Sequence, residues 1–253
     1  MNGLYLSAMG AKVQDARMDV VANNMANSQT TGYRRDMAVF RQRLATALED
    51  PRFADRASPG YEAIGGGVFL SRIAATREPG PLERTERPFD VAIDGEGFLQ
   101  VRGRDGKLYY TRSGNLRCDE EGYLVTGDGR YRVQGQGGGD ITLPPGAVEI
   151  GEDGALFVDG VVQAQIGLVM PSDPSMISKR GDSVWGKDGP VGDLASTAKI
   201  RQGWLEGSTV EPMREMTEMI EIQRTYEMNM KAMQIQDGIL GRAVTDVGRP
   251  SGS

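Results

Sequence analysis

Six acid–glycine pairs mark predicted turns in the middle of this 253-residue chain, and these pairs constrain its fold more than any other feature. An Asp-Gly pair supplies the positive φ angles that tight turns between antiparallel strands require. Strand-like runs lie between and around the pairs, for example residues 89–93, 98–101 and 108–111. Residues from about 80 to 200 therefore predict an antiparallel meander or a small barrel. The six pairs are Asp94-Gly95, Asp105-Gly106, Glu121-Gly122, Asp128-Gly129, Asp153-Gly154 and Asp159-Gly160.

Helical periodicity is confined to the two ends of the chain. Residues 3–28 carry a row spaced by three and four, which Gly32 is expected to break. Residues 211–247 carry rows spaced by seven, and Pro212 suits the first turn of that helix. The first row is Leu6, Met9, Val13, Ala16, Val20, Asn23 and Asn27. The second is Met219, Tyr226, Met233, Leu240 and Val247, with Met216, Gln223, Met230, Asp237 and Val244 as its companion row.

These patterns predict an α+β fold in which long, coiled-coil-like N- and C-terminal α-helices flank a mainly antiparallel β central domain. We expect an N-terminal segment at 1–33, a connector at 34–80, the β domain at 81–205 and a C-terminal segment at 206–253. The connector is expected to be partly extended because prolines and a run of three glycines at 65–67 interrupt it. Each terminal helix has a stripe that cannot bury itself alone, so the two helices either pair with each other or pack with other copies.

Composition excludes several classes of function. The chain has no histidine, so a Ser-His-Asp or Cys-His catalytic pair and a zinc site with a histidine ligand are excluded. The net charge of −6 argues against a nucleic-acid partner, because phosphate binding needs a basic face. No apolar run reaches the length of a membrane helix, and the N-terminus lacks the positive region of a cleaved signal peptide.

The remaining candidates for chemistry are weak. Residues 181–187 approach a phosphate-binding loop, but Asp188 stands where Ser or Thr should hold magnesium, so a hairpin loop is favoured. The run 119–121 and the pair Glu83 and Glu86 could act as catalytic carboxylates, but acids in turns are usually only solvated. We therefore predict no enzyme activity, no cofactor, no metal and no small-molecule substrate.

Two further features have an ordinary interpretation. Cys118 precedes three acids, which oppose a lowered thiol pKa, so it is expected to be structural or incidental. Arg34, Arg35, Arg41 and Arg43 form a basic cluster that could meet an acidic partner. Its default interpretation is a solvated flank of the first helix.

Four segments resemble the bacterial flagellar rod and hook protein family. They occur in the family's order and span nearly the whole chain. They are Ala22-Asn23-Asn24-Met25-Ala26-Asn27 with Thr31-Gly32-Tyr33; residues 89–98; Tyr110-Thr111-Arg112-Ser113-Gly114-Asn115; and residues 222–232 preceded by 205–208. One departure is Met25, where leucine is common.

The resemblance implies a structural subunit of the basal-body rod within the periplasm. Such a subunit is exported by the flagellar export apparatus without a cleaved signal peptide. Its partners would be copies of itself and other flagellar rod, hook or ring proteins. Segments 1–33 and 206–253 would then be assembly helices. The expected assembly residues are Leu6, Met9, Val13, Ala16, Val20, Asn23, Asn24, Asn27, Met219, Gln223, Tyr226, Asn229, Met233 and Leu240.

Within the family, the segment 144–156 resembles the proximal rod type, and the distal rod type is the next alternative. The three asparagines near the end of the first helix are expected to satisfy backbone carbonyls or to fix register. Tyr226 and Asn229 are expected either to hydrogen-bond across the helix layer or to have an ordinary surface role. The competing functions are a β-domain binding module on a helical stalk and a carboxylate-based enzyme.

Overall fold

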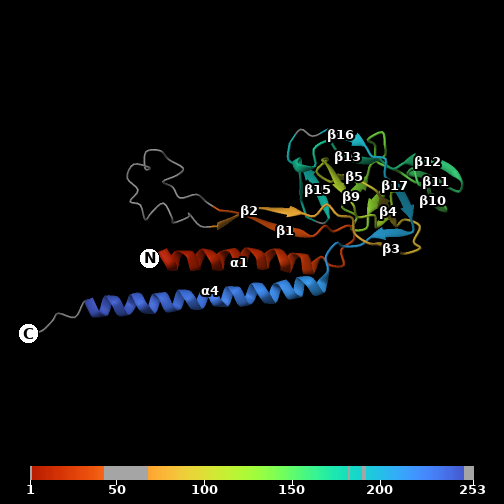
Figure 1. Ribbon diagram of the computed structural model, residues 1–253. Helices are drawn as coiled ribbons and strands as arrows, with labels where there is room; N and C mark the ends of the chain where they lie inside the picture. Colours follow the sequence, from red (N-terminus) through yellow and green to blue (C-terminus); the bar gives the residue numbers. More distant parts are fainter. Residues whose placement is uncertain (1, 43–67, 182, 190–191, 248–253) are drawn as a thin grey trace, which may run out of the picture. The chain divides into compact units, whose positions relative to one another are not determined.

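The computed structural model describes residues 2–42, 68–181, 183–189 and 192–247 (Figure 1). The chain divides into two compact units. We call residues 1–26, 36–76 and 211–253 the helical unit, and residues 27–35 and 77–210 the β unit. The chain therefore passes between the units after residues 26, 35, 76 and 210.

The helical unit contains two long helices and a two-stranded ribbon. Helix α1 spans Asn2–Ala26 and helix α4 spans Pro212–Val247, so both predicted terminal helices are confirmed, and α4 begins at the predicted proline. The end of α1 was predicted too late. The helix stops at Ala26, and Gly32 follows only after a turn, with a left-handed φ of 66°.

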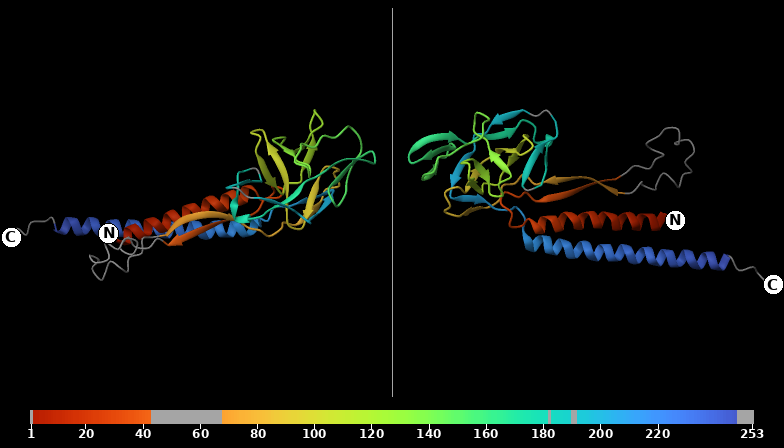
Figure 2. Two further views of the ribbon diagram at one scale, coloured as in Figure 1. Left: turned by 90° about the horizontal axis from the view of Figure 1, so that it is seen from above. Right: turned by 180° about the vertical axis from the view of Figure 1, so that it is seen from behind.

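Strands β1 (Asp36–Gln42) and β2 (Val68–Ala75) form an antiparallel pair inside the range expected to be a connector. Their register runs from Asp36 opposite Ala75 to Gln42 opposite Val68, with a bulge between Val39 and Phe40. In Figures 1 and 2, α1 lies between this ribbon and α4, in agreement with its contacts to β1, β2 and α4. Helix α1 is therefore covered on two sides within its own unit.

Within one chain, the companion row predicted on α4 is mostly exposed; Met230 is partly buried, and the side chain of Val244 is outside the described residues. Met216, Gln223 and Asp237 are exposed. The positions one residue earlier face inward instead: Glu215 and Ile222 are buried, and Asn229 and Gln236 are partly buried. A shift of one residue turns a side chain by about 100° around the helix. Because three of these four inward residues are polar, a search for apolar periodicity does not find the inward row.

The β unit consists of short strands, and every strand pair in the described parts of the chain is antiparallel, as predicted. Its largest sheet has the order β14-β15-β6-β5-β9-β8-β7, and β13 joins β5 and β16. This order is not a simple meander, whereas the sheet β10-β11-β12 is one. Two smaller pairs are β17-β4 and β18-β3.

The strands of the β unit have the following bounds. They are β3 (Leu82–Arg84), β4 (Val91–Asp94), β5 (Phe98–Gly103), β6 (Leu108–Thr111), β7 (Leu116–Cys118), β8 (Leu124–Thr126), β9 (Tyr131–Val133), β10 (Val148–Ile150), β11 (Ala155–Val158), β12 (Val161–Gln165), β13 (Leu168–Pro171), β14 (Ile177–Lys179), β15 (Val184–Lys187), β16 (Asp193–Ala195), β17 (Lys199–Gln202) and β18 (Trp204–Glu206). A short 3-10 helix, η1 (Pro174–Met176), precedes β14.

The predicted turn chemistry is confirmed at all six acid–glycine pairs, because each of these glycines has a positive φ. Only Asp159 among the six acids also has a positive φ, at 50° beside 78° for Gly160. Two consecutive positive φ angles match the two-residue hairpin turn that joins β11 to β12. The other five pairs need only their glycine in the left-handed region.

A single apolar cluster fills the β unit. It joins the inward faces of the main sheet to those of β4, β11 and β17, and many of its side chains are wholly buried. Burial alternates along β11 and β15, as in an antiparallel strand with one face on the core, whereas β4, β5 and β8 each have three consecutive buried residues and are covered on both faces. Its buried members are Val91, Ile93, Leu99, Val101, Leu116, Leu124, Val133, Ile141, Leu143, Ile150, Leu156, Val158, Ile166, Val184 and Ile200.

Candidate assembly interface

Helices α1 and α4 run antiparallel along each other. Arg17 Nη2 lies 3.0 Å from Glu218 Oε1, and Asn24 Nδ2 lies 3.2 Å from Glu215 Oε2, so contacts move back along α4 as the chain advances along α1. The Arg17–Glu218 pair is part-exposed, and such pairs contribute at most about 1 kcal/mol. The pair therefore serves register more than stability.

Asn24 hydrogen-bonds to both β1 and α4 within the helical unit. Its side chain is fully buried. Its Oδ1 accepts from Asp36 N–H at 2.8 Å, and its Nδ2 donates to the Asp36 carbonyl at 2.9 Å and to Glu215. The amide thus pairs with one residue of β1 as a neighbouring strand would, and it also joins α1 to α4. Asn23, the next residue back, is exposed.

Gly10 brings the two helices close together at the other end. A Cβ atom at this position would lie 3.2 Å from both the Oδ1 and the Nδ2 of Asn229. Such a distance is shorter than ordinary van der Waals contact, so only glycine fits beside Asn229 without a shift of its side chain. Asn229 therefore packs against the backbone of α1, which sequence reasoning did not anticipate at Gly10.

The predicted assembly residues have three kinds of surroundings. Two are buried, namely Val20 and Asn24. Seven are partly buried, namely Met9, Val13, Ala16, Asn27, Met219, Asn229 and Met233. Four are exposed, namely Leu6, Asn23, Gln223 and Tyr226. Leu240 lies in α4, and its side chain is outside the part of the chain that the structure describes.

The expectation that Arg34 is solvated is wrong. Arg34 is 5% exposed and lies in the β unit, where its Nη2 is 2.8 Å from Glu206 Oε1. Burial lowers the pKa of Arg34 below its ordinary value, the charge of Glu206 opposes that shift, and the nearby Arg112 adds to it. The buried partner lies far away in sequence, so no local pattern could reveal it. Arg43 lies outside the described residues.

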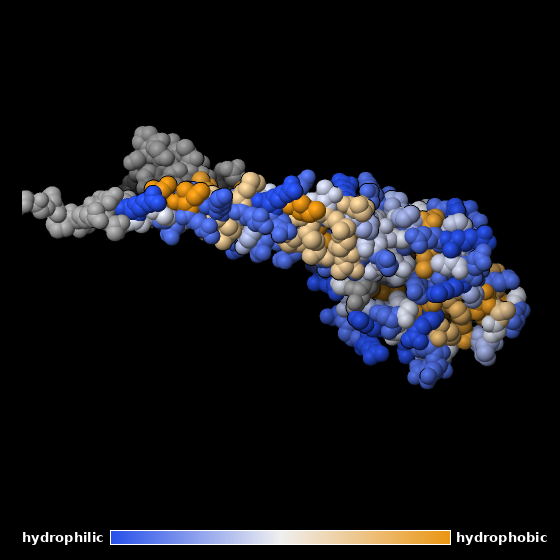
Figure 3. All heavy atoms as spheres, turned by 90° about the horizontal axis from the view of Figure 1, so that it is seen from below, coloured by the Kyte–Doolittle hydropathy of each residue, from blue (hydrophilic) through white to orange (hydrophobic). Residues whose placement is uncertain are grey.

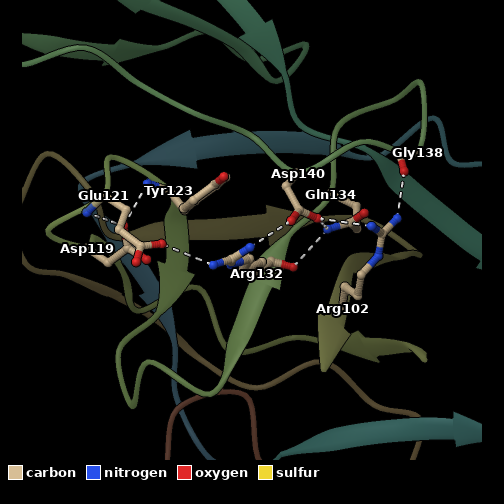
Figure 4. Close-up of polar contacts among 8 residues, drawn as sticks. All are labelled: Arg102, Asp119, Glu121, Tyr123, Arg132, Gln134, Gly138 and Asp140. Atoms are coloured by element: carbon tan, nitrogen blue, oxygen red, sulfur yellow. Dashed lines mark hydrogen bonds and ion pairs between the residues drawn. The ribbon is translucent and has the colours of Figure 1, made fainter. Parts of the chain in front are cut away.

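The acids at 119–121 serve a turn, not a catalytic pair. Asp119 Oδ1 accepts from the N–H groups of Glu121 at 3.1 Å and Tyr123 at 2.8 Å, which closes the loop between β7 and β8. Glu121 Oε2 lies 3.3 Å from Arg132 Nη2 (Figure 4). In the other proposed pair, Glu86 lies 3.3 Å from Arg84, and Glu83 is exposed on β3.

Arg132 continues the same polar network across the sheet. Its Nη1 lies 3.3 Å from Asp140 Oδ2, and its guanidinium group lies 3.9 Å from the ring centre of Tyr123. Gln134 Nε2 donates to Asp140 Oδ1 at 2.7 Å, and Arg102 lies 3.4 Å from the same carboxylate (Figure 4). The bonds from Gln134 and Arg132 lower the pKa of Asp140, which holds it ionised. The network is a charge-compensated surface that joins β5 and β9 to the loop between β7 and β8.

Residues 180–183 join β14 to β15, with a positive φ at Gly181 and Ser183, so the hairpin interpretation of the phosphate-loop candidate is confirmed. Burial and the charge of Asp119 raise the pKa of Cys118, in line with an unreactive thiol. Across the described residues, no cluster of three or more Cys, Asp or Glu side chains suits a metal ion. No helix in those residues is long and apolar enough to cross a membrane.

Three family models match successive parts of the chain. The model described as flagella basal body rod protein matches residues 4–34, which include most of α1. The flagellar hook protein FlgE/F/G D1 domain matches residues 92–158 of the β unit. The flagellar basal body rod FlgEFG protein C-terminal model matches residues 201–246, which include most of α4.

Full-length relatives agree with these models. The flagellar basal-body rod protein FlgF of Caulobacter vibrioides is 35% identical over 251 residues, which cover 98% of each chain. The protein FlgG of the same bacterium is 30% identical over 259 residues, covering 95% of this chain and 97% of that one. FlgG of Bacillus subtilis is 31% identical over 261 residues, covering 96% and 98%. Since a rod protein relative is 35% identical over 98% of both chains, and family models match both ends and the middle, the chain belongs to the flagellar basal-body rod protein family.

Proposed function

We propose that the chain is a structural, non-enzymatic subunit of the flagellar basal-body rod that polymerises through its terminal helices. The chain aligns with basal-body rod proteins over nearly their whole length. The higher identity to the FlgF protein than to the FlgG protein of the same bacterium supports the proximal rod type. The rod would lie in the periplasm, and its subunits would pass through the flagellar export apparatus.

The observation that carries this proposal is a second apolar face on α4. Ile222 is buried and belongs to the face toward α1. A helix turns about 100° per residue, so Met213 points about 180° away from Ile222. Yet the side facing away from α1 is also rich in large apolar side chains, each more than half exposed. They are Met213, Met216, Ile220, Met228, Ile235 and Ile239, which we call the outer face of α4.

Figure 3 shows this side of the helical unit, with α4 in front of α1. Orange and pale patches alternate with blue along the helix. A large apolar surface on the side of a helix away from its packing partner is typical of a helix that is also buried on that side. Isolated exposed apolar residues are ordinary, but a row of six along one helix indicates a partner surface. Methionine, which has a flexible and polarizable side chain, suits neighbours that differ slightly in position.

We infer that the partner is helix α1 of another subunit. The exposed side of α1 combines small residues, Ala22 and Ala26, with the carboxylates of Asp15 and Asp19. Small side chains permit close approach of two helices. The outer face of α4 carries Arg224 and Lys231 among its apolar residues, and both are exposed. Each surface also carries an exposed charge of the opposite sign, Lys12 on α1 and Glu227 on α4, so ion pairs of both polarities can form between them.

This arrangement divides the predicted assembly residues by task. Apart from Asn27, which follows α1, the buried and partly buried ones hold α1 on α4 within one subunit, in the coiled-coil-like manner that the seven-residue spacing favours. The exposed ones, Leu6, Asn23, Gln223 and Tyr226, would contact neighbouring subunits. The segments 1–33 and 206–253 remain the predicted assembly segments.

Deleting the gene and imaging basal bodies by electron microscopy tests the proposed function. We expect basal bodies that stop within the rod, and cells that do not swim until the gene is restored. Complete basal bodies and normal swimming in the deletion strain would contradict a rod role. A truncation at the outer part of the rod, with the inner part assembled, would indicate the distal type in place of the proximal one.

A further inference from the structure

Glu206, at the end of β18, is the most heavily bonded buried acid of the β unit. It is 1% exposed, and the two arginines that bind it, Arg34 and Arg112, are each 5% exposed. Glu206 Oε1 lies 2.8 Å from Arg34 Nη2 and accepts from Gly80 N–H at 2.9 Å. Its Oε2 lies 3.2 Å from Arg112 Nη1. The cluster thus holds two cations around one carboxylate, out of contact with solvent.

The backbone next to Glu206 holds residues 27–35. The Gly32 N–H donates to the Glu206 carbonyl at 2.7 Å. Thr209 N–H donates to the Tyr33 carbonyl at 3.0 Å, and Arg35 N–H donates to Thr209 Oγ1 at 2.7 Å. Gly32 is required here twice over: its φ is positive, and a Cβ atom would lie 2.6 Å from the Arg112 carbonyl carbon.

The same carboxylate holds residues 77–81. Besides the Gly80 amide, Arg34 Nη1 donates to the Arg77 carbonyl at 3.2 Å. Gly207 N–H donates to the Pro81 carbonyl at 2.8 Å, directly after Glu206 in the chain. Residues 27–35, 77–81 and 206–209 are thereby bonded to one another around a single side chain.

These three segments lie next to all four points at which the chain passes between the two units. The crossings follow residues 26, 35, 76 and 210. When a buried ion pair loses one partner, the other charge stays buried without compensation. This costs far more free energy than replacing both partners with apolar residues. Loss of the Glu206 charge would leave two buried guanidinium groups facing each other, so the three segments should loosen together.

We propose that Glu206 anchors all four chain crossings to the β unit, and that rod assembly depends on this residue although it lies outside the terminal helices. The second part rests on the proposed function; the first does not. Glu206 is in this sense a positioning residue, since it acts through the segments that lead to α1, β1, β2 and α4.

Hydrogen exchange on the full chain in solution tests the anchor. In Glu206→Gln, which keeps the shape and removes the charge, we expect the protection of amides in 27–35 and 77–81 to fall by roughly tenfold or more. Amides of the main sheet, such as those of β5 and β6, should keep theirs. The matched control is Glu83→Gln, an exposed acid on the paired strand β3, which should change neither set.

A second variant distinguishes the contact to residues 27–35 from the contact to residues 77–81, and it keeps the test valid if the first variant misfolds. Arg34→Gln removes one cation and leaves Glu206 paired with Arg112, so residues 27–35 should loosen while the Gly80 amide stays protected. An unchanged pattern in both variants, or a uniform fall over the whole β unit, would overturn the anchor.

In the deletion strain, Glu206→Gln should restore swimming much less than Glu83→Gln. Selective loosening with full swimming would overturn the dependence of assembly on Glu206. A deletion strain that swims normally without any copy would instead refute the proposed function and leave the exchange result standing.

Discussion

At the scale of single residues, adjacent asparagines in α1 have opposite surroundings. Asn24 is fully buried and bonded to Asp36 and Glu215, while Asn23 is exposed. Replacing Asn24 by Ala leaves buried polar groups without their partner, which costs about 1–3 kcal/mol. We expect Asn24→Ala to lower the free energy of unfolding of the helical unit by about that amount, measured by chemical denaturation. Asn23→Ala is the matched control, and an equal loss there would contradict the assignment.

Tyr110 offers a pH test of a buried side chain in the β unit. Its hydroxyl donates to Asp193, whose carboxylate also lies 3.0 Å from Lys187 Nζ. Burial and the bond to Asp193 raise the pKa of Tyr110 to about 12. The folded chain therefore keeps a proton that the unfolded chain releases from about pH 10, so stability falls as pH rises from about 10 to 12.

We expect that fall to be smaller in Tyr110→Phe by an amount on the order of 2–3 kcal/mol, measured by denaturation at pH 9 and pH 12. Phenylalanine has no proton to release, so its contribution does not change across this window. Parallel pH curves for the two proteins would show that Tyr110 titrates normally.

At the scale of elements, the approach of α1 to α4 depends on Gly10. Alanine at an open helical position would stabilise the helix by up to about 1 kcal/mol. Here its Cβ would crowd Asn229 at 3.2 Å. We expect Gly10→Ala to lower the melting temperature, and Asn229→Ala in the same chain to reverse the loss. Gly238→Ala, for which nothing lies within 4 Å of the added atom, is the control and should raise it or leave it unchanged.

Elements were predictable where the signal was local. Pro212 marks the first residue of α4, and each acid–glycine pair fixes one turn, because backbone geometry at these positions depends on adjacent residues alone. The β1–β2 ribbon was missed, because its register depends on pairing between segments far apart in sequence. The buried side of α4 was not evident from the sequence, because polar residues such as Glu215 occupy part of it.

At the scale of the whole molecule, the family and the α+β class were evident from sequence, whereas the contacts that organise each unit were not. Asn24 and Glu215 meet across 191 residues, and Arg112 and Glu206 across 94. Nothing in one sequence reports which distant partners meet. The signature residue Gly32 was recognisable, but its reason, close packing against Arg112, appears only in the folded chain.

The central claim is that subunits join through the outer face of α4. Its most direct test is electron microscopy of basal bodies in the deletion strain carrying Ile220→Lys with Ile235→Lys. Both side chains are more than half exposed. We expect the purified variant to keep its helical circular dichroism and the basal bodies to stop within the rod. Asp237→Lys, at an exposed polar position that lies about 160° around the helix from Ile235, should restore complete basal bodies. Complete basal bodies with the double isoleucine variant would contradict the account.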